Sequence, residues 1–236
     1  MVRFILIGGK GKDSTMNHIE DEMLKMTNKK NPIVLYCPYA TKDMEKSCLK
    51  FHNLMKNLEC EIIDLSMDNI NDFDNLLNKA DILYVGGGVS DDLVEIFKNY
   101  NLDKILYKYL DSDKIYAGSS AGAMLYTKIA MGDKDMFSDN YHNYNYKMVK
   151  CLDILDISIC PHYQNEDLII YNDEIKDYPF DSFGIEEDTA VIIDENKFAC
   201  LKDDRKRSVY YFSKDNHLMT PIYEGVKYEK GSSFRS

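Results

Sequence analysis

The chain has 236 residues and a mass of 27.4 kDa, and its 44% hydrophobic and 29% charged residues are typical of a globular protein and exclude wholesale disorder. Its 29 Lys and Arg residues face 40 Asp and Glu residues, and the net charge of -11 argues against a nucleic-acid binder, which needs a basic face to displace counterions. No apolar run approaches the roughly 18 residues of a membrane helix, and residues 1–9 lack the pattern of a signal peptide. We therefore expect a single domain over residues 1–236, located in the cytoplasm, with neither nucleic-acid nor membrane partners.

Short apolar runs alternate with helical patterns over the first 130 residues, which is typical of a parallel sheet covered by helices on both faces. The predicted strands cover residues 4–7, 33–37, 62–65, 82–85 and 115–117. The predicted helices cover residues 14–26, 44–58, 70–77, 90–97 and 121–130.

The pattern changes after residue 130. Residues 131–150 are rich in Asp, Asn and Tyr and predict a loop. A buried strand is expected over 155–160, and short strands follow at 190–193, 198–201, 209–212 and 219–223. We expect these last strands to extend the sheet at one edge as antiparallel hairpins.

None of the six cysteines belongs to a C-x-x-C pair, so the sequence excludes a zinc ribbon and a thioredoxin-like motif. Thiols of a cytoplasmic protein are expected to be reduced. Cys37 and Cys160 lie in apolar, strand-like runs and are expected in the core.

A G-x-S-x-G pattern is centred on Ser120, between an apolar run that ends at Ala117 and a helical stretch that begins at Ala121. This is the setting of a nucleophile elbow, where the chain turns sharply from strand into helix at the serine. Side chains two positions before and after the serine would collide, so Gly118 and Gly122 fit the turn. The N–H of Ala121 would then lie at a helix N-terminus, where it can stabilise an oxyanion.

Three glycines, Gly86 to Gly88, join a predicted strand to a predicted helix. Glycines let backbone amides approach a ligand closely, and the carboxyl ends of strands line the ligand site of α/β sheets. Gly87 or Gly88 could thus supply a second oxyanion donor. A phosphate-binding loop is the rival interpretation, but no G-x-G-x-x-G and no lysine follow here, and the segment Gly8–Lys12 lacks the Walker spacing.

A serine nucleophile needs a base, and His162 is the best candidate because it follows an apolar run and the stiff Pro161, just past a strand end. The other four histidines lie on predicted helices, in the predicted loop or in a hairpin turn: His18, His52, His142 and His217.

The residues alone leave the orienting acid open. The candidates are three carboxylates between two strand-like runs and two upstream: Glu186, Glu187, Asp188, Asp133 and Asp135. The chain order of an α/β-hydrolase would give Ser120, Asp188 and His217. The same order is met by Ser120, Asp135 and His162.

Four segments occur in the order seen in the peptidase E (aspartyl dipeptidase) family, to which cyanophycinase is related. They are Gly86-Gly87-Gly88, Gly118-Ser119-Ser120-Ala121-Gly122-Ala123-Met124, Pro161-His162-Tyr163 and Gly184-Ile185-Glu186-Glu187-Asp188-Thr189-Ala190. The chain thus resembles this family over residues 82–194. The resemblance implies a class I glutamine-amidotransferase-like α/β fold, with a mostly parallel central sheet, helices on both faces and antiparallel edge strands near the C-terminus.

The resemblance also implies a Ser-His-Glu triad in a serine peptidase, dipeptidase-like, that acts on short peptides without a metal or organic cofactor. Ser120 corresponds to the nucleophile, His162 to the base and Glu187 to the orienting acid. The oxyanion donors correspond to Ala121 and Gly88, with Gly87 one position away. An esterase or amidase for another small acyl substrate, and a non-catalytic ligand-binding protein, are the alternatives, and the oligomeric state stays open.

The chain departs from the family pattern in two places. Val89-Ser90 stand where the family often has Asn-Thr after its glycines. Members that prefer aspartate have an arginine downstream of the histidine, and arginine is the natural bidentate partner of a carboxylate. In this chain, residues 163–178 contain no arginine, and Lys176 is their only basic residue. We therefore expect no strong preference for acidic residues, and the Tyr-rich stretch 141–146 is a candidate border of a pocket for neutral or aromatic side chains.

Overall fold

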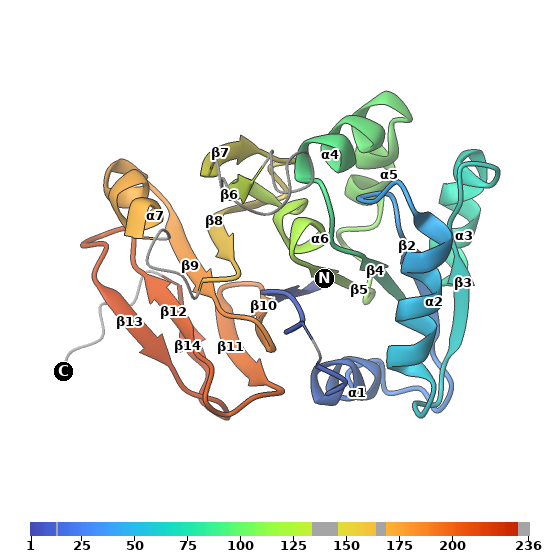
Figure 1. Cartoon of the computed structure of the whole chain (residues 1–236), viewed down its shortest axis with the longest axis horizontal. Coiled ribbons are helices and arrows are strands. Elements are labelled where there is room, and N and C mark those ends of the chain that lie inside the picture. Colours follow the sequence, from blue (N-terminus) through green and yellow to red (C-terminus); the bar gives the residue numbers. More distant parts are fainter. Residues whose placement is uncertain (13, 134–145, 164–168, 231–236) are drawn as a thin grey trace.

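The computed structural model describes residues 1–12, 14–133, 146–163 and 169–230, and its strands form two sheets (Figure 1). The larger sheet has eight strands in the order β14-β11-β10-β1-β5-β4-β2-β3, and the smaller has six in the order β13-β12-β9-β8-β6-β7. The larger sheet is parallel from β1 to β3 and antiparallel toward β14. The predicted class, a mostly parallel α/β sheet with antiparallel edge strands, is confirmed.

The helices and strands have the following bounds. The strands of the larger sheet are β1 Arg3–Ile7, β2 Ile33–Cys37, β3 Glu61–Asp64, β4 Ile82–Val85, β5 Ile115–Ser119, β10 Thr189–Asp194, β11 Lys197–Lys202 and β14 Tyr228–Glu229. Those of the smaller sheet are β6 Thr127–Asp133, β7 Tyr146–Lys150, β8 Leu155–Pro161, β9 Asp181–Ile185, β12 Val209–Phe212 and β13 Met219–Ile222. The helices are α1 His18–Lys25, α2 Met44–Met55, α3 Phe73–Lys79, α4 Ser90–Asn99, α5 Leu102–Lys108, α6 Ala121–Met124 and α7 Ile169–Glu174, and 3₁₀ turns cover Ile70–Asp72 and Ile175–Asp177.

Strand β1 shows how the sequence covers both faces of the larger sheet. Successive side chains of a strand point to opposite faces. Phe4 and Leu6 belong to the core that includes α3, α4 and α5, whereas Ile5 and Ile7 belong to the core that includes α1 and α2. Buried strands of this kind have continuous apolar runs because helices cover them on both sides.

The smaller sheet packs against the first through the same core. Ile157 and Ile159 of β8 and Phe183 of β9 lie in one buried cluster with Phe4 and Leu6 of β1. Strand β8 is parallel to both β6 and β9. The carboxyl ends of β8 and β9 therefore lie side by side.

The second sheet corrects three expectations. Residues 127–130 are not helical, because Thr127 to Asp133 pair with β7 and β8 as strand β6, and this pairing overrides a helix-like composition. The expected loop 131–150 includes the end of β6 and all of β7, and residues 134–145 lie outside the described chain. Strands β12 and β13 extend this smaller sheet rather than the larger one, whose antiparallel edge consists of the predicted β10 and β11 and of β14, which the sequence did not predict.

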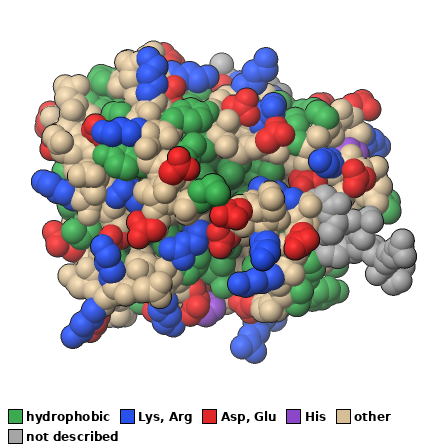
Figure 2. Space-filling model, turned by 180° about the vertical axis from the view of Figure 1, so that it is seen from behind, with side chains coloured by type: hydrophobic (Ala, Val, Ile, Leu, Met, Phe, Trp, Pro, Cys, Tyr) green, Lys and Arg blue, Asp and Glu red, His purple; other side chains and the backbone are tan. Residues whose placement is uncertain are grey.

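Other features match or refine the sequence prediction. Cys37 and Cys160 are fully buried, and all six cysteines are free thiols. Helix α5, which the sequence did not predict, follows α4 directly. In the described ranges, no helix combines the length and the apolar character needed to cross a bilayer. Lys and Arg side chains mix with Asp and Glu on the face seen in Figure 2.

Candidate active site

The elbow at Ser120 has the geometry that its glycines require. Strand β5 ends at Ser119, Ser120 has φ 53° and ψ -116°, and α6 begins at the next residue. A Cβ on Gly118 would lie 2.2 Å from the carbonyl oxygen of Gly122, and one on Gly122 would lie 2.0 Å from that of Val85. A non-glycine residue at positive φ costs of order 1–3 kcal/mol and persists only where its surroundings enforce it. Strain of this kind is characteristic of functional sites.

Three side chains form a continuous hydrogen-bonded row at this elbow. His162 follows β8, and Glu187 lies in the turn between β9 and β10. The Nε2 atom of His162 is 2.9 Å from Ser120 Oγ, and its Nδ1 atom is 2.9 Å from Glu187 Oε1. The side chains of His162 and Glu187 are 37% and 27% exposed, so a substrate can reach the row from solvent. The parallel pairing of β8 and β9 brings the histidine and the acid together.

Among the described residues, the competing Asp188 and His217 have surroundings other than Ser120. The carboxylate of Asp188 accepts from the N–H of Gly11 at 3.3 Å, and His217 lies in the turn between β12 and β13. Among the residues that the structure describes, His217 Nδ1 is buried and has no hydrogen-bond partner. Asp133 ends β6, and Asp135 lies outside the described residues. Neither order left open by the residues alone is assembled around Ser120 within the described part of the chain.

Electrostatics favour an ionised Glu187. The hydrogen bond with His162 lowers the pKa of this carboxyl, burial opposes that effect, and electrostatic interactions with His162 and Arg207 lower it further. An ionised carboxylate at Nδ1 fixes the imidazole in the tautomer whose Nε2 can accept a proton. The charge of Arg207 thus reaches this site.

The end of β1 and the two residues after it accept backbone hydrogen bonds from the three segments that carry the serine, the histidine and the acid. The sequence did not predict this role. The N–H of Ser120 donates to Ile7 O at 2.9 Å, and that of His162 donates to Gly8 O at 2.9 Å. The N–H of Asp188, which follows the acid, donates to Gly9 O at 2.8 Å. A Cβ on Gly9 would lie 2.3 Å from His162 Cε1, so the ring packs directly on this glycine. Two adjacent glycines after a buried strand were the only signal for this role.

The glycine loop between β4 and α4 lies beside the serine. A Cβ on Gly87 would lie 3.2 Å from Ser120 Cβ. Gly88 has φ 151°, and a Cβ there would lie 2.0 Å from Ala40 O, so only glycine fits. Apart from bonds within helices and strands, the described residues offer no backbone acceptor to three N–H groups near the serine: those of Gly87, Gly88 and Ala121. The N–H of Val89, in contrast, donates to Ala40 O at 2.7 Å.

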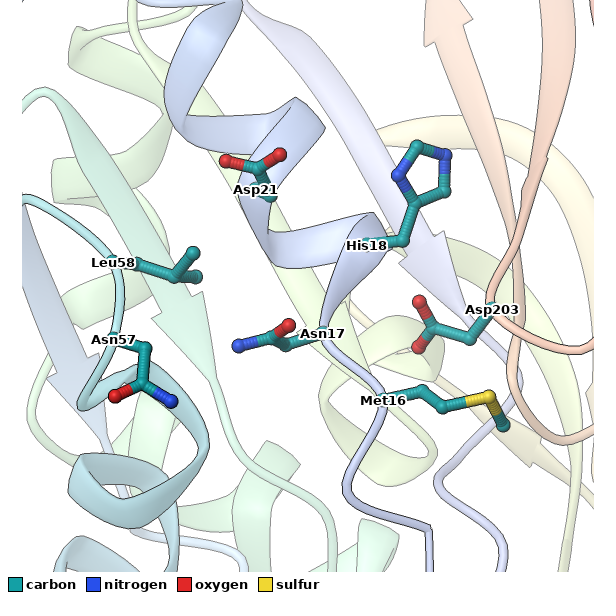
Figure 3. A pocket seen from close by; sticks show the side chains of 7 residues that line it. All are labelled: Met16, Asn17, His18, Asp21, Asn57, Leu58 and Asp203. Atoms are coloured by element: carbon teal, nitrogen blue, oxygen red, sulfur yellow. The ribbon is translucent and has the colours of Figure 1, made fainter.

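A separate open cavity of about 540 Å³ lies beside α1 and does not include the hydrogen-bonded row (Figure 3). Its lining residues are Met16, Asn17, His18, Asp21, Asn57, Leu58 and Asp203. Potential metal ligands of His18, Asp21 and Glu22 lie within 4.8 Å of one another at this surface. Both carboxylates also pair with Lys25, at 2.7 and 2.8 Å, so this helix face is explained by surface ion pairs.

Comparisons with known proteins agree with the fold and with the expected peptidase family. The chain is 26% identical over 170 residues to the Uncharacterized peptidase YgaJ of Bacillus subtilis (strain 168), which covers 70% of each chain. It is 29% identical over 109 residues to the Uncharacterized peptidase Lmo0363 of Listeria monocytogenes, 44% of this chain and 51% of the relative. The crystal structure of a peptidase from an acI-B1 Actinobacterium is similar in fold, with a TM-score of 0.73, 18% identity and 97% of each chain covered. The family model of peptidase family S51 matches residues 4–201, and the chain belongs to that family.

Proposed function

We propose that this protein is a serine peptidase that hydrolyses short peptides through Ser120, His162 and Glu187. The observation that carries the proposal is the hydrogen-bonded row at the elbow, in which both ring nitrogens of His162 are engaged at 2.9 Å. A nucleophile within hydrogen-bond reach of a base that a third group orients is the general signature of covalent acyl transfer. Membership of a peptidase family supports an amide as the bond that is cleaved.

Each side chain then has one role. His162 Nε2 takes the proton of Ser120 as Oγ attacks the carbonyl carbon, and the resulting imidazolium donates from Nδ1 to Glu187. When the tetrahedral intermediate collapses, the imidazolium gives its proton to the leaving amine and the acyl group stays on Oγ. Water, deprotonated by the same imidazole, releases the acid and restores the serine. No metal or organic cofactor takes part in this scheme.

Backbone N–H groups are the proposed partners of the oxyanion. Ala121 begins α6 immediately after Ser120, so its N–H lies at the nucleophile. The glycine loop approaches Ser120 from β4, and Gly88, with Gly87 beside it, supplies the second donor. Removal of one such donor typically costs 10²–10³ in kcat, about 2.7–4 kcal/mol. We also propose that residues 1–236 act as one hydrolytic domain, since the two sheets share a core.

The proposed substrates have a neutral side chain at the scissile bond. A substrate carboxylate buried without a partner would be costly to desolvate. The expected pocket border at Tyr141–Tyr146 lies outside the described residues except for Tyr146, the first residue of β7, which packs against a buried cluster that includes Tyr171 and Phe212. A preference for Asp over Leu of more than about tenfold in kcat/KM, roughly 1.4 kcal/mol, would contradict this substrate class. Arg207 would then be the first cation to substitute, because its charge reaches Glu187.

The test of the proposed function is a dipeptide panel that varies only the first residue. The wild-type protein should release free amino acids, and Ser120→Ala should abolish release without a change in melting temperature. Ser119→Ala is the matched control and should retain most of the activity, because the Ser119 side chain interacts with Tyr84 rather than with His162. Hydrolysis of small esters but no dipeptide would favour the esterase alternative. If Ser119→Ala abolished hydrolysis while Ser120→Ala stayed active, the assignment of Ser120 as the nucleophile would be overturned.

A further inference from the structure

A buried ion cluster lies directly after the two glycines that hold the site. The Nζ atom of Lys10 donates to Glu20 Oε2 at 2.9 Å, to Met16 O at 2.9 Å and to the carboxylate of Asp203. The side chains of Glu20 and Asp203 are completely inaccessible, and that of Lys10 is 19% exposed. These three residues, called here the Lys10 cluster, join the segment after β1, helix α1 and the turn after β11.

The cluster is well satisfied by hydrogen bonds. Asp203 Oδ1 accepts from the N–H of Ile19 at 2.9 Å, and Glu20 Oε1 accepts from the hydroxyl of Tyr84 at 3.3 Å. Burial lowers the pKa of Lys10, but the charges of Glu20 and Asp203 and the hydrogen bonds to them together outweigh it, and the net shift is upward. Burial raises the pKa of Glu20, and the charge of Lys10 opposes that rise. The ammonium is therefore held as a cation between two acids.

A cluster of this kind needs an explanation beyond stability. Buried ion pairs often contribute little or nothing to stability relative to apolar side chains of similar size. The Lys10 cluster touches none of the reacting groups, so it takes no part in proton transfer. What it does hold is the chain next to Gly8 and Gly9, whose carbonyls accept from the N–H groups of His162 and Asp188.

Glycine leaves this segment without side chains of its own to fix it, and glycine has the greatest backbone freedom of all residues. Gly9 has φ 124° and contacts the ring of His162. The first side chain after the two glycines that can anchor the segment is that of Lys10. A displacement here would move the carbonyls of Ile7, Gly8 and Gly9 and, with them, the elbow and the histidine.

We propose that the Lys10 cluster positions the end of β1, and that Lys10 is a positioning residue for Ser120 and His162. The inference rests on the proposed function and goes beyond it by assigning a role to side chains outside the hydrogen-bonded row. It also explains the Gly8-Gly9-Lys10-Gly11-Lys12 motif without a phosphate ligand, because the ammonium of Lys10 is turned into the cluster.

The experiment compares two variants of the cluster with a matched control. Lys10→Met leaves two buried carboxylates without a counterion and is expected to lower the melting temperature. The triple variant Lys10→Met/Glu20→Gln/Asp203→Asn removes all three charges together and is expected to fold. Lys114→Met is the control, because Lys114 is also partly buried, binds Asn78 O and Ala80 O, and precedes the opposite end of β5.

Steady-state kinetics on the best dipeptide then separates positioning from stability. We expect the folded triple variant to lose about 100-fold in kcat with KM nearly unchanged, since a misplacement of about 1 Å at a reacting group costs this much. Labelling of Ser120 by a fluorophosphonate should slow by a similar factor, and Lys114→Met should match the wild type in both.

A folded triple variant with wild-type kcat would overturn the inference. Failure of both cluster variants to fold would also overturn it, because the cluster would then be a folding element alone. A wild-type protein that neither cleaves the panel nor reacts with the fluorophosphonate would instead refute the proposed function. The two failures are therefore distinguishable.

Discussion

Gly9→Ala should damage catalysis through the histidine ring while it leaves every group of the hydrogen-bonded row chemically intact. A Cβ at this position would lie 2.3 Å from Cε1, 2.8 Å from Nε2 and 2.9 Å from Nδ1 of His162. Ordinary van der Waals contacts of a Cβ begin at 3.4 Å. The ring must therefore retreat by about 1 Å, which stretches one or both of its 2.9 Å bonds to Ser120 and Glu187.

The expected loss is about 100-fold in kcat/KM, because a misplacement of about 1 Å in a reacting group costs about this much. The change also destabilises the fold, since an alanine at φ 124° costs of order 1–3 kcal/mol. A direct effect on catalysis must be separated from this loss of stability. The assay is therefore dipeptide hydrolysis well below the melting temperature, with the folded fraction measured by circular dichroism.

Gly225→Ala supplies the matched control. Gly225 also has a positive φ, 80°, but a Cβ there would meet no atom of the described residues within 4 Å. This variant carries a similar backbone penalty without a contact at the site, so it should lose stability and keep its activity. A Gly9→Ala protein that retains kcat/KM within about twofold, or a Gly225→Ala protein that loses as much, would refute the reasoning.

Three further predictions concern the acid and the thiols. Glu187→Gln should lower kcat by up to about 10⁴-fold, the effect of a comparable Asp-to-Asn change in a serine protease. Glu186→Gln should cost far less, because that carboxylate accepts from the N–H of Ser208 instead; a larger loss in Glu186→Gln would reverse the assignment. The pKa of Glu187 in the folded protein is lowered from 4.5, so the ionised carboxylate stabilises the fold fully above pH 4.5. This contribution is lost as the pH falls through the pKa of the folded state. In an acid titration, the stability of the Glu187→Gln protein should therefore fall less steeply than that of the wild type. Burial raises the pKa of Cys37 to about 12 and raises that of Cys160 well above its usual value, and both thiols are buried. Iodoacetamide should therefore modify the partly exposed Cys48 and Cys60 first in the native protein; early mapping of the label to Cys37 would contradict the buried position.

The larger sheet could be predicted from sequence because its signals are local. Each buried strand is a short apolar run, and each is closed by glycine, proline or a helical period. The elbow was equally local, since Gly118, Ser120 and Gly122 lie within five residues of chain. The choice of Glu187 as the proposed acid came from the family resemblance and not from the residues alone, which left two other orders open.

The smaller sheet and the support of the site depend on contacts distant in sequence. Residues 127–130 resemble a helix in composition but pair with strands more than ten residues away, which no local pattern reveals. The role of Ile7 to Gly9 as acceptor for three segments depends on residues 120, 162 and 188. Lys10 and Asp203 are 193 positions apart. In the sequence, Lys10 belonged to a glycine-rich segment considered as a phosphate-binding loop, and Asp203 preceded a turn expected to be solvated.

The most direct test of the central claim is to locate a fluorophosphonate adduct on the native protein by peptide mass mapping. The hydrogen-bonded row predicts one adduct, on Ser120, which disappears on denaturation and in Ser120→Ala, and which forms far more slowly in Glu187→Gln. A folded protein that forms no adduct, or that carries it on Ser119 or on a serine far from His162, would contradict the assignment of Ser120 as an activated nucleophile.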